Sequence, residues 1–162
     1  MERDPIDDYD ELTEPPMMRR VRRALLALLV AFMLGTGLDL MLLDHHEDAW
    51  QLVPLALLAA GLVVSVWTLR GRAGALTAMR ILMVLFVAAG FLGITLHYLG
   101  NREFQLEMDP AAAGWPLFLK VVTAKSPPAL APASMVMMGL LGLIYTYQHP
   151  AFSRIAHREP QP

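Results

Sequence analysis

Four long apolar stretches alternate with short polar segments along this chain of 162 residues. The apolar stretches cover residues 21–43, 50–69, 75–99 and 128–147. A helix rises 1.5 Å per residue, so about 20 apolar residues cross the ~30 Å hydrocarbon core of a bilayer. The pattern therefore predicts an all-α membrane protein, in which residues 19–149 form a bundle of four transmembrane helices.

The composition supports this interpretation, because 56% of the residues are hydrophobic and only 17% are charged. Soluble domains carry about 25% charged residues and 45–50% apolar ones. The chain has no cysteine, which excludes disulfides, thiolate metal sites and thiol redox chemistry. Its formal net charge of −2 gives no electrostatic support to a nucleic-acid partner, and we expect none.

The two ends of the chain differ from the membrane domain. Residues 1–18 hold seven acids before Pro15-Pro16, which predicts a disordered, solvated acidic tail. Residues 150–162 form a second tail. About twenty residues precede the first apolar stretch, and that stretch is long enough to span, so we expect a retained helix rather than a cleaved signal peptide.

Lysine and arginine are distributed unequally between the two sides of the expected bundle. Nine, not counting Arg3 in the acidic tail, lie on the side of both chain ends and the 70–74 turn, whereas Arg102, Lys120 and Lys125 lie on the other. The positive-inside rule then places both termini in the cytoplasm (N-in/C-in) of a bacterial-type inner membrane. The arginines within the stretch Arg19–Arg23 are expected to contact anionic lipid.

The long connection over residues 100–127 would then face outward, and its length predicts that it is structured. Residues 103–109 alternate polar and apolar side chains, the period of an extended strand. After Asp109-Pro110, a short helix would have one face that lies on the membrane surface, formed by Trp115, Phe118, Leu119 and Val122. A β-hairpin is the alternative for this loop, and we favour the short helix.

The polar cluster Asp44-His45-His46-Glu47-Asp48 lies between the first two apolar stretches, on the outer side. Acids outnumber bases there by seven to three, and three of the five histidines join them. Carboxylates and imidazoles bind Zn²⁺, Mn²⁺ and non-haem iron, although the spacing matches no established motif. The hypothesis of a divalent metal site requires His45 or His46 to approach His97 and the loop carboxylates. Its candidate ligands are His45, His46, Glu47, His97, Glu103 and Glu107.

Asp39 is a second candidate, for proton or charge handling. It precedes the outer end of the first span by about one turn, in apolar surroundings that disfavour a charged carboxylate. The alternative is a hydrated carboxylate near the membrane surface. Haem is not expected, because the histidines lie at the membrane edge and no second pair exists.

Two structural predictions follow from local residue types. Asp48 is expected to cap the second helix, with Gln51 completing a capping-box-like pair. Glycine pairs are expected to let helices approach closely, because small residues drive helix packing in lipid. These pairs are Gly35 and Gly37, Gly90 and Gly93, and Gly139 and Gly142.

The sequence shows no nucleophile motif, phosphate loop or dinucleotide-binding pattern, so we favour a non-enzymatic protein. It would act as an accessory or structural subunit or a sensor, docking a membrane-protein partner or a second copy through its outer loop and lipid-facing helices. The alternative is a metal-binding or proton-handling membrane protein that uses the outer histidine and carboxylate site. The third is a redox or lipid-modifying enzyme acting at the outer surface.

Overall fold

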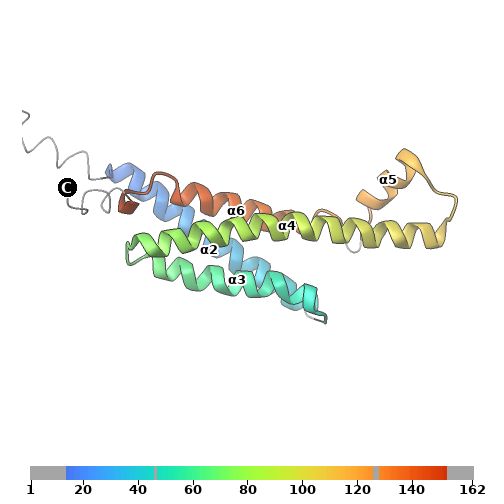
Figure 1. Cartoon of the computed structure of the whole chain (residues 1–162), viewed down its shortest axis with the longest axis horizontal. Coiled ribbons are helices and arrows are strands. Elements are labelled where there is room, and N and C mark those ends of the chain that lie inside the picture. The colour runs from blue at the N-terminus through green and yellow to red at the C-terminus, as the bar shows by residue number, and fades with distance from the viewer. Residues whose placement is uncertain (1–13, 46, 126–127, 153–162) are drawn as a thin grey trace, which may run out of the picture.

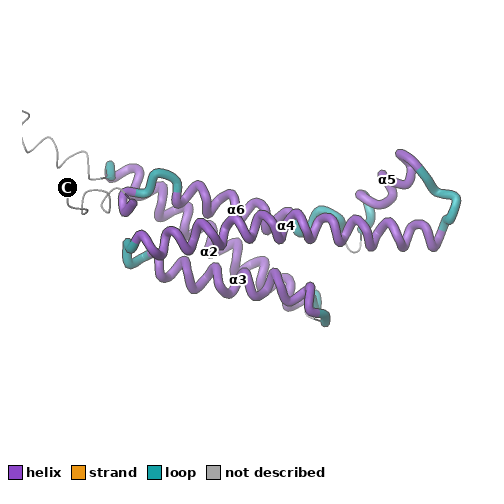
Figure 2. The backbone as a smooth tube through the Cα atoms, in the orientation of Figure 1, coloured by secondary structure: helices purple, strands orange, loops and turns teal. Residues whose placement is uncertain are grey.

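The computed structural model describes residues 14–45, 47–125 and 128–152, and every regular element in these ranges is a helix (Figures 1 and 2). Helices α2, α3 and α4 are each long and apolar enough to cross a membrane, which supports an integral membrane protein. Helix α6 has 14 residues and is shorter than a full span. The helices are α2 (Pro16–Leu42), α3 (Ala49–Thr68), α4 (Ala73–Met108), α5 (Gly114–Val122) and α6 (Ala133–Thr146).

Helices α2, α3, α4 and α6 run alongside one another in an elongated bundle, and α6 packs against both α4 and α2 (Figure 1). The core between them fully buries Leu29, Met33 and Phe86. Large apolar side chains also cover the outside of the three long helices, where Val63 and Ile81 are exposed. A bundle that is apolar on its outside as well as in its core suits a lipid environment.

Glycines bring the backbones of α4 and α6 close together, which agrees with the prediction that glycine pairs let helices approach closely. A Cβ added to Gly139 would lie 2.6 Å from the carbonyl oxygen of Met83, and one added to Gly90 would lie 2.5 Å from the Val136 side chain. Gly93 and Gly142 are similarly crowded. The first pair differs: Gly35 has no atom within 4 Å of its added Cβ, and Gly37 meets only ordinary van der Waals contact at 4.0 Å.

Helix α4 is longer than predicted, because it continues through residues 100–108. The strand prediction for residues 103–109 is therefore wrong. A strand needs a neighbouring strand for its backbone hydrogen bonds, and the described ranges contain none. The helix instead satisfies these groups internally, while α5 packs against it. The short helix that we favoured is present, although it begins at Gly114 rather than directly after Asp109-Pro110.

Three other boundaries differ from the predicted ones. Helix α2 begins at Pro16, inside the segment expected to be a tail, because a proline at the first helical position needs no N–H partner. Helix α6 begins only at Ala133, after consecutive turns over residues 128–132. Helix α3 lies within one residue of its predicted range of 50–69. The rest of the predicted tails, residues 1–13 and 153–162, lies outside the described residues.

Two arginines hold the last turn of α6. Arg22 of α2 donates hydrogen bonds to the carbonyl oxygens of Tyr145 at 2.6 Å and Tyr147 at 2.9 Å, and it also pairs with Glu14. Arg80 of α4 donates to the carbonyl oxygen of Thr146 at 2.7 Å. These cations satisfy carbonyls that have no partner inside the helix. The sequence had suggested only lipid contact for Arg22.

The two ends of the bundle are therefore different. The first turn of α2, the 69–72 turn and the last turn of α6 share one end (Figure 1). The opposite end, called the projecting end below, holds the turn of residues 43–48 and the segment of residues 98–125, which extends past the other helices (Figure 1). The predicted site residues that the structure describes lie at or near the projecting end.

Candidate functional site

The first half of the polar cluster terminates helix α2. Asp44 has a φ of 51°, the left-handed conformation common just after a helix. The N–H of Asp44 bonds to the carbonyl of Met41 at 3.2 Å, and the N–H of His45 bonds to that of Leu40 at 2.9 Å. This pair of bonds is the Schellman pattern, so Asp44 occupies a position where glycine is the usual residue.

The second half of the cluster starts helix α3. The Asp48 carboxylate accepts hydrogen bonds from the N–H groups of Trp50 at 2.8 Å and Gln51 at 2.9 Å, which confirms the predicted cap. The Gln51 side chain accepts from the N–H of Glu47 at 2.8 Å, one residue earlier than a standard capping box requires. The Asp48 carboxylate therefore has a structural function in the turn.

His45 and His97 lie side by side, and they join the α2–α3 turn to α4. Their ring centroids are 6.3 Å apart, and both side chains are half-buried. His97 Nδ1 lies 3.0 Å from the carbonyl oxygen of Pro128, which connects the segment before α6 to the same point. Since a carbonyl only accepts, Nδ1 of His97 is the donor in this contact. The predicted approach of His45 to His97 is present.

The carboxylates do not join these histidines. Glu103 and Glu107 follow His97 on α4 by about 9 and 15 Å along the axis, at 1.5 Å per residue. Glu47 is exposed in the turn, and His46 lies outside the described residues. Within the described ranges, no three His, Asp or Glu side chains gather closely enough to hold a metal ion. Of the predicted ligands, the structure brings together His45 and His97.

Asp39 lies on the exposed surface of α2, next to the exposed Leu38. It does not face the bundle interior, where a proton-handling carboxylate would be shielded by other helices. Its position near the end of α2 fits a carboxylate close to the membrane surface. The assignment of a proton or charge site to Asp39 stays a prediction.

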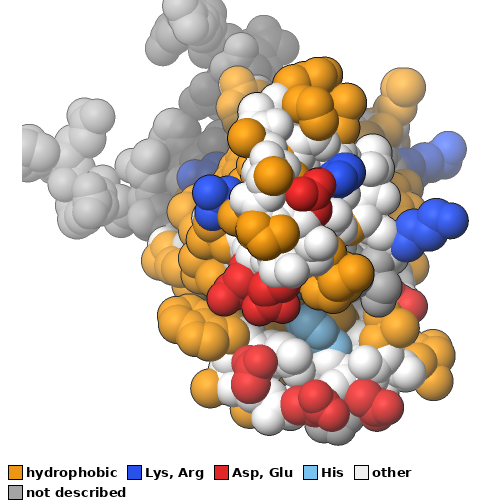
Figure 3. Space-filling view, turned by 90° about the vertical axis from the view of Figure 1, so that its right-hand side faces the viewer, with side chains coloured by type: hydrophobic (Ala, Val, Ile, Leu, Met, Phe, Trp, Pro, Cys, Tyr) orange, Lys and Arg blue, Asp and Glu red, His pale blue; other side chains and the backbone are white. Residues whose placement is uncertain are grey.

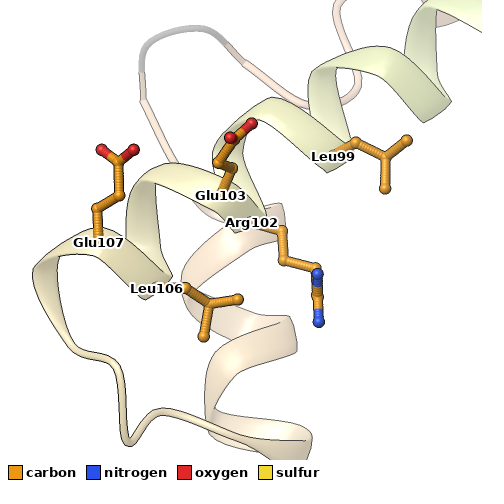
Figure 4. Close-up of a pocket in the computed structure, with 5 residues that line it drawn as sticks. All are labelled: Leu99, Arg102, Glu103, Leu106 and Glu107. Atoms are coloured by element: carbon orange, nitrogen blue, oxygen red, sulfur yellow. The ribbon is translucent and has the colours of Figure 1, made fainter.

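A shallow groove runs along the projecting part of α4 (Figure 4). All the residues that line it belong to this one helix, so the groove is open to its surroundings. The side chains of Glu103 and Glu107, one turn apart, extend to the same side of the helix (Figure 4). The lining residues are Leu99, Arg102, Glu103, Leu106 and Glu107.

Helix α5 folds back onto α4 beside this groove. Leu117 and Val121 are its buried residues, and the buried Asn101 donates a hydrogen bond to the Val121 carbonyl at 3.4 Å. The Phe118 ring lies 6.2 Å from the Tyr98 ring, measured between centroids. These contacts hold α5 against the last three turns of α4.

Acidic side chains gather on the projecting end, and a histidine is visible between them (Figure 3). They come from two places, the α2–α3 turn and the projecting part of α4. The exposed acids of these segments are Asp44, Glu47, Asp48, Glu103, Glu107 and Asp109. Comparison with protein-family models, curated proteins and solved structures gave no match to this chain.

Proposed function

We propose that this chain is a small integral membrane protein that acts as an accessory or structural subunit, or as a sensor, and binds a partner through its projecting end. The length of α4 carries the proposal. Its 36 residues extend about 54 Å at 1.5 Å per residue, whereas a bilayer core is ~30 Å thick. A third or more of the helix is therefore available to a partner outside the hydrocarbon.

The groove on α4 indicates the chemistry of that partner. Leu99 and Leu106 offer apolar contact, while Glu103 and Glu107 offer two carboxylates on one side (Figure 4). Neither glutamate forms an ion pair within the described residues, whereas Asp109 contacts Lys120 at 3.4 Å. An amphipathic helix with basic residues beside its apolar face fits this surface. An open groove suits docking better than catalysis, which requires a site that restricts water.

Photo-crosslinking in the native membrane tests this proposal. A photoreactive amino acid at Leu106, in the groove, should form one discrete protein adduct, and the same probe at Leu42, on exposed α2, should not. The double variant Glu103→Lys/Glu107→Lys should abolish the adduct through charge reversal. An adduct of twice the chain's mass would identify the partner as a second copy. The proposal fails if both positions react alike or if charge reversal has no effect.

The proposal includes a fourth span and a defined orientation. Helix α6, with the turns of residues 128–132, would complete the crossing and bring both termini to the cytoplasmic side of a bacterial-type inner membrane. Because the chain has no cysteine, single introduced cysteines report sidedness cleanly. A membrane-impermeant maleimide should label Met108→Cys in intact cells and Leu69→Cys only after permeabilisation. The reverse pattern would overturn the orientation.

The His45–His97 contact favours metal binding as a second candidate function. With ring centroids 6.3 Å apart, these two histidines would supply two ligands of a Zn²⁺, Mn²⁺ or Fe²⁺ ion, and the remaining ligands would come from groups other than the described carboxylates. The Pro128 carbonyl would orient His97 in the way that outer-shell carbonyls orient metal-binding histidines. Elemental analysis should find metal in the native protein and none in His97→Asn, whose amide can keep the bond to Pro128. A metal-free native protein would exclude this candidate.

A further inference from the structure

Helix α5 has an apolar surface on two sides. Leu117 and Val121 are buried against the rest of the protein, whereas Trp115 is 67% exposed, Phe118 is 38% exposed and Leu119 is 44% exposed. The Trp115 and Phe118 rings stack with centroids 4.9 Å apart, so they form one exposed aromatic patch. Exposure of such a patch to water costs about 25 cal/mol per Å² of apolar area, so another apolar phase would stabilise it.

The charges of α4 locate this patch relative to a bilayer. Residues 81–101, between Arg80 and Arg102, contain no acidic or basic residue except His97. At 1.5 Å per residue, these ~21 residues extend about 31 Å, which matches the hydrocarbon thickness. Tyr98 and Asn101 therefore lie at one boundary of the hydrocarbon, and these are the two residues that hold α5 through Phe118 and Val121.

We propose that α5 lies on the bilayer surface at the projecting end, with Trp115 and Phe118 in the boundary between lipid headgroups and acyl chains. Two observations select lipid as the occupant of this patch. The patch lies at the depth of the headgroups, and it is aromatic like the belts of membrane proteins. The inference is independent of whether α4 binds a partner.

Met108 provides a matched control position. It is 72% exposed, close to the value for Trp115, so exposure alone predicts the same environment for both residues. It follows Asn101 on α4 by about 10 Å at 1.5 Å per residue, which places it in water. A difference in lipid contact between Trp115 and Met108 therefore follows only if α5 lies at the proposed depth in the bilayer.

Tryptophan fluorescence in vesicles measures this difference. The chain has three tryptophans, so Trp50→Phe/Trp67→Phe leaves Trp115 as the single reporter. Adding Trp115→Phe and Met108→Trp to that variant moves the reporter to the control position. The vesicles contain phosphatidylcholine with a minor share of phosphatidylglycerol, and a spin label near the headgroup serves as the lipid quencher. Acrylamide serves as the aqueous quencher.

We expect the lipid label to quench Trp115 severalfold more strongly than the Met108→Trp reporter, and acrylamide to show the opposite order. Equal acrylamide quenching at both positions would overturn the proposal. Protection of Trp115 from both quenchers would also overturn it, because a protein surface would then cover the patch. If the multiple variant does not fold, the difference between the native chain and Trp115→Phe gives the same measurement for Trp115.

Discussion

The guanidinium of Arg22, near the start of α2, donates a hydrogen bond to the carbonyl oxygen of Tyr145, near the end of α6, at 2.6 Å. The same group reaches the carbonyl oxygen of Gln148 at 3.1 Å, and the Arg22 side chain is only 12% exposed. Because the last carbonyls of a helix have no internal partners, this cation connects α2 directly to the end of α6. Arg23, its neighbour, is exposed.

Arg22→Gln should therefore destabilise the fold while Arg23→Gln should not. Hydrogen bonds to charged groups contribute about 1.5–3 kcal/mol each, so we expect Arg22→Gln to lower the free energy of unfolding by about 2 kcal/mol. Arg23→Gln should change it by less than about 0.5 kcal/mol. Both variants lose one positive charge, so their attraction to anionic lipid is matched. Unfolding in detergent micelles measures the free energy of unfolding of both variants. If both variants lose the same amount, Arg22 contacts lipid rather than holding α6.

The glycines of the bundle provide a second matched pair. Gly139→Ala places a Cβ 2.6 Å from a backbone oxygen that cannot move away easily, so we expect a loss of about 1–3 kcal/mol from overpacking. Gly35→Ala enters open space within a helix, where alanine is favoured over glycine by about 0.5–1 kcal/mol. Melting temperatures in detergent should therefore shift in opposite directions. A shift in the same direction would contradict the α4–α6 packing.

Asp44 and Asp48, two of the three acids of the α2–α3 turn, should respond differently to removal. Asp48→Ala deletes the α3 cap and should cost about 1 kcal/mol. Asp44→Gly supplies the residue best suited to a φ of 51°, so stability should be retained or increased. Chemical or thermal unfolding distinguishes these outcomes. If both variants instead lose bound metal with similar losses of stability, the acids act as ligands rather than as parts of the turn.

Asn101 should control the attachment of α5. Asn101→Ala leaves the Val121 carbonyl without this donor, so we expect α5 to loosen by about 1–3 kcal/mol while the bundle remains folded. Limited proteolysis within residues 109–125 should then accelerate, without a matching change in the melting temperature. Gln105→Ala, one turn further along α4, is the control and should leave the rate unchanged. If proteolysis accelerates in both variants, a general weakening of α4, and not the loss of the Asn101–Val121 hydrogen bond, releases α5.

The strand prediction for residues 103–109 failed because a short alternating pattern does not decide between a strand and a helix. A seven-residue alternation over residues 103–109 fits a strand, but the same residues place Glu103 and Glu107 one turn apart on a helix. Backbone groups can be satisfied in either form, so the choice depends on what packs nearby. Here α5 covers α4 from the side of Asn101, and α4 continues as a helix to Met108.

The sequence by itself predicted the long apolar helices α2, α3 and α4 and the cap at Asp48, and it favoured the short helix α5 over a hairpin. Each depends on residues only a few positions apart: the length of an apolar stretch, or a side chain that bonds to a backbone N–H three residues later. The sequence also predicted that a helix approaches Gly139 closely, but it did not predict that this helix is α4. These features are local, so they could be predicted before any helix was placed beside another.

Only the tertiary structure decided which helices meet and which faces remain open. His45 lies beside His97, and Arg22 reaches Tyr145. Gly35 lies in open space, although the sequence places it in a glycine pair just as it does the crowded Gly139. The physical reason is that lipid is as apolar as the side chains of the helices, so hydrophobicity does not select which face turns inward. Close packing and a few long-range hydrogen bonds make that selection, and they involve residues far apart in the chain.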